Sequence, residues 1–127
     1  MSKISTDKEK IQEILTRGVA NIYPSKEFLE NELNSDKQLT LYLGIDPTGP
    51  TLHLGHIIPM EKLRQFQELV HKVILLIGDF TGTVGDPTDK SATRQALTPK
   101  QVLQNAKDYQ KQAKTILEFA GKNKVEL

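Results

Sequence analysis

Two histidines, three residues apart, are the side chains in this sequence best suited to chemistry. His53 and His56 flank Gly55 in the run 46–56 (DPTGPTLHLGH), which joins an apolar segment to the start of a predicted helix. The first amide N–H groups of a helix lack partners within it, and the helix dipole favours negative charge at that end. With a glycine that lets a ligand approach the backbone, the pair predicts a polyphosphate site. The simpler interpretation is that one histidine only caps the helix.

The elements that must position this pair alternate between strand and helix. Helical spacing of apolar residues predicts helices over 8–20, around 28–33, over 54–69 and over 98–120, and nearly continuous apolar runs predict strands over 38–45 and 73–77. Residues 78–94 read as a long glycine-rich loop. Thr98, Pro99 and Gln101 form a capping box at the start of the last helix.

This order predicts an α/β fold, a Rossmann-like parallel sheet with flanking helices and right-handed crossovers. In such sheets ligands bind outside the carboxyl ends of the strands, where the histidines lie. A parallel sheet needs more than two strands, and residues 124–127 (KVEL) resemble the opening of a third. We therefore expect the first half of a domain, an N-terminal fragment. It divides into a helical segment, 1–37, and a nucleotide-binding unit, 38–127.

Composition narrows the class of protein. The chain has 127 residues, 37% hydrophobic and 26% charged, which is typical of a soluble globular domain. It has no cysteine, which excludes disulfides and thiolate metal sites, and we identify no other metal site. No apolar run is long enough to span a membrane and no signal core precedes the first helix, so we expect a cytoplasmic protein without membrane contact. A net charge of +1 gives no bulk signal for nucleic acid.

Two long blocks of this sequence resemble the class I aminoacyl-tRNA synthetases, and among them the tyrosyl-tRNA synthetase family. Residues 46–56 are similar to the family's "HIGH" signature, and residues 76–94 (LIGDFTGTVGDPTDKSATR) to its second glycine-rich block. Residues 62–67 (KLRQFQ) and 105–110 (NAKDYQ) also fit. The likeness covers about residues 38–120. This sequence contains no counterpart of the family's "KMSKS" loop or of its anticodon-binding region.

The resemblance implies a role for each matching position. His53 and His56 would contact ATP phosphates and stabilise charge on the α-phosphate while the carboxylate of tyrosine attacks it. It further implies ATP contacts at Gly44, Asp46, Pro47, Thr48 and Gly55, tyrosine contacts at Tyr42, Thr81 and Asp86, and a grip on departing pyrophosphate by Lys90 and Arg94. ATP and L-tyrosine would be substrates, Mg²⁺ would arrive with ATP, and the whole enzyme would be a homodimer that charges tRNA. Such catalysis needs positioning and donors aimed at phosphate charge, which histidine, lysine and arginine supply.

Other interpretations stay open. The chain could belong to a related class I enzyme for tryptophan, although Asp46, His56 and Tyr42 argue against this, or to a nucleotide-binding module without catalysis. Tyr42 could be an edge tyrosine, and Lys90 with Arg94 a solvated pair. We expect half of a site to have little activity alone.

Some positions depart from the family pattern or compete for a role. Asp79 follows the second strand directly and rivals Asp86 as the carboxylate for the substrate ammonium. Val70 stands where glycine is usual, which implies a different helix exit or backbone strain. Pro59, one turn into the signature helix, either fits the tolerated first turn or bends the helix. Neither a P-loop nor a GxGxxG fingerprint is present in the sequence.

Overall fold

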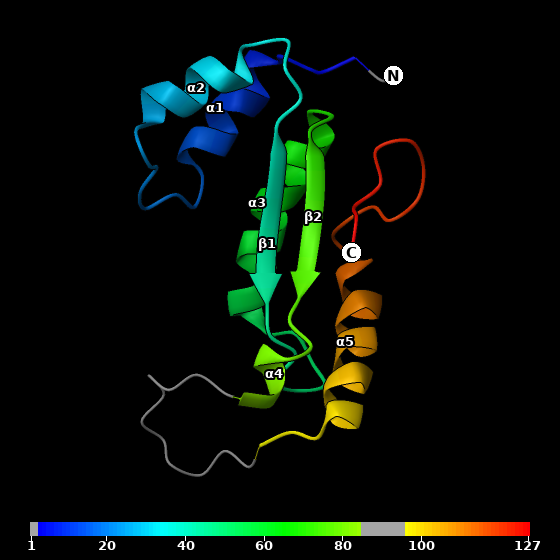
Figure 1. Cartoon of the computed structure of the whole chain (residues 1–127). Coiled ribbons are helices and arrows are strands. Elements are labelled where there is room, and N and C mark those ends of the chain that lie inside the picture. Colours follow the sequence, from blue (N-terminus) through cyan, green and yellow to red (C-terminus); the bar gives the residue numbers. More distant parts are fainter. Residues whose placement is uncertain (1–2, 85–95) are drawn as a thin grey trace.

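The computed structural model describes residues 3–84 and 96–127. Its elements, in chain order, are α1 (Lys8–Thr16), α2 (Lys26–Leu33), β1 (Thr40–Ile45), α3 (Leu54–Glu68), β2 (Lys72–Ile77), α4 (Thr81–Val84) and α5 (Pro99–Ala113) (Figure 1). Both strands and the helices that follow them lie where the sequence predicts. The α/β alternation is thus confirmed.

The two strands form a parallel pair with Leu41 opposite Val73 and Ile45 opposite Ile77. Glu126 extends this sheet: its N–H donates to the carbonyl of Val73 at 3.0 Å and its carbonyl accepts from Leu75 N–H at 2.8 Å. The bridge between Ile74 and Glu126 is parallel. The predicted opening of a third strand at 124–127 is therefore confirmed as a parallel bridge on the free side of β2.

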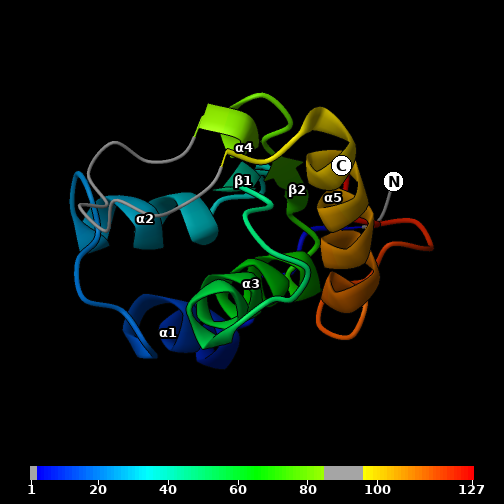
Figure 2. The same cartoon turned by 90° about the horizontal axis from the view of Figure 1, so that it is seen from below.

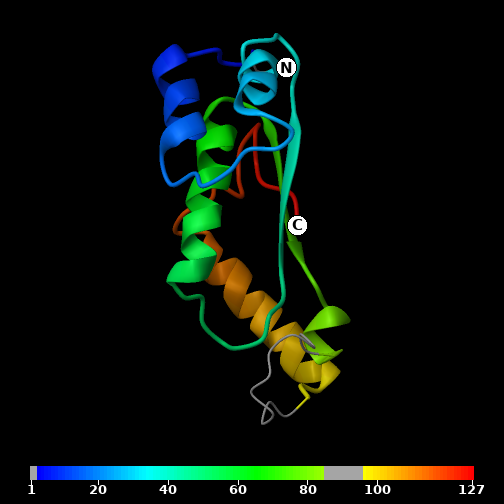
Figure 3. The same cartoon turned by 90° about the vertical axis from the view of Figure 1, so that its left-hand side faces the viewer.

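Helices lie on one face of the sheet. Seen along the edge of the strands, α3 and the core stand on one side, and no described element covers the opposite face of β1 and β2 (Figure 3). On that open face Tyr42 is 74% exposed and Leu76 is 54% exposed. The apolar runs predicted strands covered on both faces, so the described part of the chain provides only one of the two covering layers.

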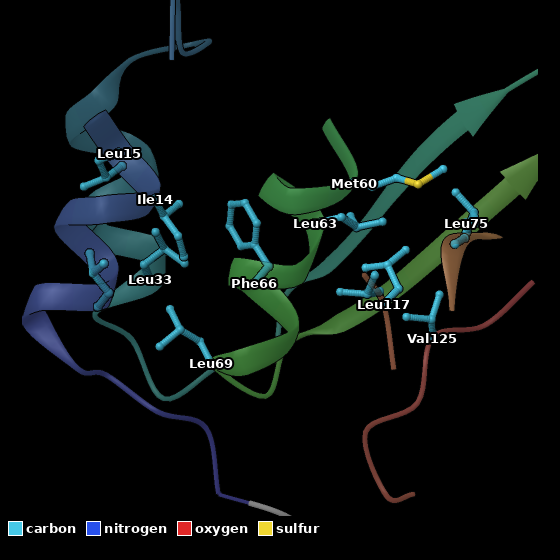
Figure 4. Packing of buried hydrophobic residues seen from close by; sticks show 13 residues of the cluster. Ile14, Leu15, Leu33, Met60, Leu63, Phe66, Leu69, Leu75, Leu117 and Val125 are labelled. Carbon is cyan, nitrogen blue, oxygen red and sulfur yellow. The ribbon is translucent and has the colours of Figure 1, made fainter. Parts of the chain in front are cut away.

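The core lies between α3, the inner sheet face and the N-terminal helices. Figure 4 shows Met60, Leu63 and Phe66 of α3 between the side chains of α1 and α2 on one side and Leu75 on the other. Met60, Leu63 and Phe66 are the apolar face that the helical spacing predicts, and all three are buried. α1 and α2 thus share one hydrophobic cluster with the sheet.

The N-terminal helices begin at side-chain caps. Asp7 accepts a hydrogen bond from Lys10 N–H, and Ser25 accepts one from Phe28 N–H. α1 ends at Thr16, earlier than predicted, because Arg17 is extended and Gly18 adopts φ +64°. The predicted helix over 8–20 is therefore too long, and Val19 lies beyond it.

Two long polar side chains of α3 attach the rest of the chain to it. Lys62 Nζ donates to the carbonyls of Ile14 at 2.9 Å and Arg17 at 2.8 Å, at the end of α1. Gln67 Nε2 donates to the carbonyls of Glu118 at 2.7 Å and Asn123 at 2.8 Å, in the segment before the third strand. α3 is therefore bonded to both terminal regions.

The last helix is also shorter than predicted. It starts at the expected capping box of Thr98 with Gln101, but it ends at Ala113 instead of near residue 120. The Thr115 hydroxyl donates to the carbonyl of Gln112. The N–H groups of Ile116 and Leu117 both donate to the carbonyl of Ala113. The N–H groups of Thr115 and Ile116 reach back three residues instead of four, so the regular α-helical pattern ends here. In addition, the single turn α4 lies within the predicted loop 78–94.

Val70, the valine that departs from the family pattern, lies in the turn from α3 to β2. Val70 adopts φ +70°, a left-handed conformation that is rare for a β-branched residue. His71 behind it is fully buried, and its Nδ1 accepts the N–H of Leu39 at 3.2 Å. His71 thus supports the turn, and of the two alternatives for Val70 the structure shows backbone strain.

Pro59 lies inside α3, beyond the first turn. It has no N–H to donate to the carbonyl of Gly55, four residues earlier.

No helix in the described part of the chain is long and apolar enough to cross a membrane.

Candidate active site

The candidate site lies where the two strands end, at the bottom of Figure 1. Asp46 follows β1 directly, and Gly78 follows β2. The N–H of Gly78 donates to the carbonyl of Ile45 at 2.9 Å, so the strands stay paired up to this edge. Both following segments therefore start side by side, as expected for parallel strands.

The two strand ends are joined by a side-chain hydrogen bond. Thr81 Oγ1, at the start of α4, donates to Asp46 Oδ1 at 2.5 Å. A Cβ atom at Gly78 would clash with both oxygens, so only glycine leaves room for this contact. The bond links Asp46, predicted to contact ATP, with Thr81, predicted to contact tyrosine.

Gly78 was not singled out by the sequence reasoning. The signal that could have found it is a glycine immediately after a buried strand, where a neighbouring backbone or side chain often approaches closely.

The rival carboxylate Asp79 is exposed, and its Oδ1 accepts the N–H of Phe80 at 2.7 Å. This local bond occupies one of its oxygens.

The histidine pair begins α3. His53 is the N-cap residue, and its Nδ1 accepts the N–H of Gly55 at 3.1 Å. His56 reaches back, and its Nδ1 accepts the N–H of His53 at 3.2 Å. The ring centroids lie 3.8 Å apart. The capping interpretation and the functional one are thus compatible, because each ring uses one nitrogen for the cap.

These bonds determine the tautomers. A ring nitrogen that accepts a hydrogen bond carries no proton, so each neutral imidazole holds its proton on Nε2. Both histidines therefore keep an Nε2–H donor that the cap does not use. Burial, with a smaller contribution from the nearby charge of His53, lowers the pKa of His56 below its usual value. The neutral, capping form is favoured near neutral pH.

The positive end of α3 has no acidic side chain of its own. Its first turn, which lies wholly within the described residues, carries no acidic side chain. The helix dipole and two Nε2–H donors at one end make this a place where an anion is stabilised.

α5 lies against the loop that leads into the pair, as the view from below in Figure 2 shows. Asn105 Nδ2 donates to the carbonyl of Pro47 at 2.9 Å. Gln112 Nε2 donates to the carbonyl of Pro50, and its Oε1 accepts the N–H of Leu52, both at 2.9 Å. The sequence did not indicate that Asn105 and Gln112 bond to this loop. Only the likeness of 105–110 to the family pointed towards this helix.

Tyr109 of the same helix is 1% exposed, and its ring centroid lies 5.4 Å from that of His56. Tyr109 therefore packs against a histidine of the candidate site. The geometry is tilted, with an interplanar angle of 59°. Such an aromatic contact limits where the imidazole can lie.

Other predicted positions lie apart from the histidines. Tyr42 and Gly44 are on the open face of β1, opposite to the face that α3 covers. Pro47 is fully buried, and Thr48 is exposed with its N–H donating to the carbonyl of Asp46 at 2.9 Å. The predicted residues Asp86, Lys90 and Arg94 lie outside the described residues. Among residues 3–84 and 96–127, no cluster of three His, Cys, Asp or Glu residues could hold a metal ion.

Several curated proteins similar to this chain are tyrosine–tRNA ligases. A tyrosine–tRNA ligase of Carboxydothermus hydrogenoformans is 51% identical over 111 residues, which cover 85% of this chain and 27% of that protein. One from Haemophilus ducreyi is 53% identical over 110 residues, covering 87% and 28% respectively. The chain thus spans about a quarter of the length of these curated relatives.

The fold is similar to part of a solved structure as well. A C-terminally truncated mitochondrial tyrosyl-tRNA synthetase of Aspergillus nidulans superposes with a TM-score of 0.67 and 26% identity, over 84% of this chain and 29% of that one. The predicted Rossmann-like class I architecture is thereby confirmed for the part present. A family model described as "tRNA synthetases class I (W and Y)" matches residues 34–124. The chain belongs to this family of class I tRNA synthetases.

Proposed function

We propose that this chain supplies the ATP-binding part, and some of the tyrosine-binding part, of a tyrosine–tRNA ligase. The observation that carries the proposal is the reciprocal cap of His53 and His56, which leaves two Nε2–H donors at the positive end of α3. The family membership and the names of the relatives support the choice of ATP and tyrosine.

The proposed reaction places these donors on the phosphates of ATP. A carboxylate oxygen of tyrosine attacks the α-phosphorus, the bond to the β-phosphate oxygen breaks, and tyrosyl-adenylate and pyrophosphate form. His53 and His56 donate from Nε2 to phosphate oxygens whose negative charge grows during the attack. Gly55 keeps the backbone beside them accessible. Asp46, bonded to Thr81, lies between the ATP and tyrosine parts of the site.

Binding of ATP to the chain tests this proposal. We expect ATP to shift the amide signals of α3's first turn in NMR titrations, more than adenosine does. His53→Ala and His56→Ala should each weaken binding by about tenfold or more, the effect of losing one well-placed donor to a charged group.

A matched control is Ser25→Ala, which removes the N-cap of α2. It should lower stability by about 1 kcal/mol and leave ATP binding unchanged. If ATP shifts no signals in α3, or if both histidine variants bind as well as the original chain, the proposed ATP site is wrong.

Tyrosine is the proposed amino acid. Tyr42 on β1 and Thr81 on α4 are the proposed tyrosine contacts within the described residues, and Asp86 is proposed from the sequence. Because the family includes enzymes for tryptophan, amino-acid-dependent exchange of pyrophosphate into ATP should be measured with both. We expect any exchange to depend on tyrosine, and to be weak for this chain. Dependence on tryptophan alone would contradict the assignment.

The finer parts of the proposal follow the family resemblance. Mg²⁺ would arrive with ATP, and Lys90 and Arg94 would contact the leaving pyrophosphate. The complete enzyme would be a cytoplasmic homodimer that transfers tyrosine to tRNA. We also propose residue 37 as the boundary between the helical segment and the unit, 38–127, that carries the site.

A further inference from the structure

One face of α5 is bonded to the loop that carries the histidine pair. Asn105, Tyr109 and Gln112 are spaced i, i+4 and i+7, so they share that face. Asn105 bonds to the start of the loop, Gln112 bonds to its end, and Tyr109 packs against His56. The three contacts follow the loop from its first residues to the first turn of α3.

The loop needs such support because its own residues offer few backbone donors. Pro47 and Pro50 have no N–H, yet their carbonyls still require partners. Asn105 and Gln112 provide these partners. Gln112 does more, since its amide donates to the carbonyl of Pro50 and accepts from the N–H of Leu52, as a neighbouring strand would.

The contact with Leu52 bears directly on the histidines. Leu52 precedes His53, whose extended backbone starts the cap. The position of the Leu52 peptide therefore decides where the His53 ring lies, and the cap links that ring to His56. Gln112 also donates to the carbonyl of Asp108 on its own helix at 3.1 Å, which holds the side chain in place.

We propose that Gln112, assisted by Asn105, is a positioning residue for the histidine pair. It acts through the backbone of Pro50 and Leu52 and touches no ligand itself. The positioning rests on hydrogen bonds within the chain, and its consequence for ATP rests on the proposed function.

The test compares two glutamines that each bond to main-chain groups. Gln112→Met removes the bonds to the loop, whereas Gln67→Met removes bonds to Glu118 and Asn123, far along α3 from the histidines. The first readout is the ring ¹⁵N spectrum of His53 and His56, which reports tautomer and hydrogen bonding. The second is ATP affinity, and the third is the urea midpoint.

We expect Gln112→Met to change the ring signals of His53 and His56 and to weaken ATP binding by about tenfold, the effect of losing one well-placed donor to a charged group. Gln67→Met should lower the urea midpoint and leave the ring signals unchanged. A folded Gln112→Met protein with unchanged ring signals would overturn the proposal, and so would equal ring changes in both variants.

A second variant covers the case in which Gln112→Met does not fold. Gln112→Glu keeps an oxygen for the N–H of Leu52 but loses the donor to Pro50. It should restore the His53 ring signal towards that of the original chain, which a general loss of stability would not do. Failure of the original chain to bind ATP, with ring signals that still respond to Gln112, would refute the proposed function and leave the positioning role intact.

Discussion

Each histidine of the pair uses Nδ1 to accept a backbone N–H, and Nε2 takes no part in the cap. This division depends on the neutral form, because a protonated Nδ1 cannot accept the N–H of Gly55 or of His53. Both caps therefore depend on an unprotonated Nδ1. The same chemistry makes the start of α3 sensitive to pH.

We predict that the chain loses stability as the pH falls below the ordinary histidine value of 6.5. Burial lowers the pKa of both His56 and His71, so the folded state binds fewer protons than the unfolded state. Stability is therefore fully present above pH 6.5 and is lost as the pH falls through the folded-state pKa values. Urea unfolding at a series of pH values measures this.

The variant His56→Asn separates the contribution of His56 to this pH dependence from that of His71. Its side-chain oxygen can still accept the N–H of His53, but it does not titrate. We expect a shallower loss of stability on acidification than in the original chain, with the remainder due to His71. An unchanged slope would show that His56 does not contribute.

Strain at Val70 yields a second prediction. A non-glycine residue in the left-handed region costs about 1–2 kcal/mol. Val70→Gly should therefore raise the free energy of unfolding by about 0.5–1 kcal/mol, after allowance for the greater freedom of glycine in the unfolded chain. Chemical denaturation checks the sign.

The matched control is Gly121→Val. Gly121 has φ +80°, and a Cβ there would meet no atom within 4 Å. The added side chain should lower stability by about 1–2 kcal/mol through backbone strain alone. Stability changes of the same sign in both variants would contradict this account.

At the scale of elements, α3 organises its neighbours through Lys62. Its Nζ bonds to two carbonyls at the end of α1, where a positive charge also suits the helix dipole. Burial lowers the pKa of Lys62, which nevertheless has these two partners. Lys62 therefore holds the N-terminal helices against the core.

We predict that Lys62→Met destabilises the chain by about 1–3 kcal/mol, because two carbonyls lose a charged donor while the apolar stem is kept. The rate of amide hydrogen exchange should increase more in α1 than in the other elements. Lys107→Met, on the exposed side of α5, serves as the control and should change stability by less than about 0.5 kcal/mol. Uniform loss of protection in α1 and α5 alike would argue against a local attachment.

Sequence patterns predicted the elements better than their ends. α3 begins at Leu54, as expected, because the cap at His53 and an apolar face both mark it. α5 stops early because the hydroxyl of Thr115 competes for a backbone carbonyl, which no apolar spacing reveals. The contact of Asp46 with Thr81 spans 35 residues and depends on the room at Gly78, so it required the folded chain.

At the scale of the whole molecule, the sheet has one covered and one open face. Alternation along β2 places Leu75 inside, with no exposure, and Leu76 outside, with 54% exposure. The open face continues to Tyr42 across the strand pair. Neighbouring leucines of one strand thus have opposite environments.

We predict a large loss of stability for alanine at Leu75 and a small one for alanine at Leu76. Leu75→Ala should lower the free energy of unfolding by about 2–5 kcal/mol, the cost of a cavity in a packed core. Leu76→Ala should lower it by less than about 1 kcal/mol, because little apolar area leaves contact. Calorimetry of the pair measures both. Equal losses would mean that the open face is covered in solution.

Lys62 and Gln67 have one further consequence, because most of their bonds end on main-chain carbonyls. Every amino acid carries the same carbonyl, so the attachment of α1 and of residues 118–123 does not depend on which side chains those segments bear. Mutations at Arg17 or Glu118 therefore leave the bonds from α3 available. Over evolutionary time the two terminal regions can diverge in sequence while the start of α3, with its histidines, keeps its place.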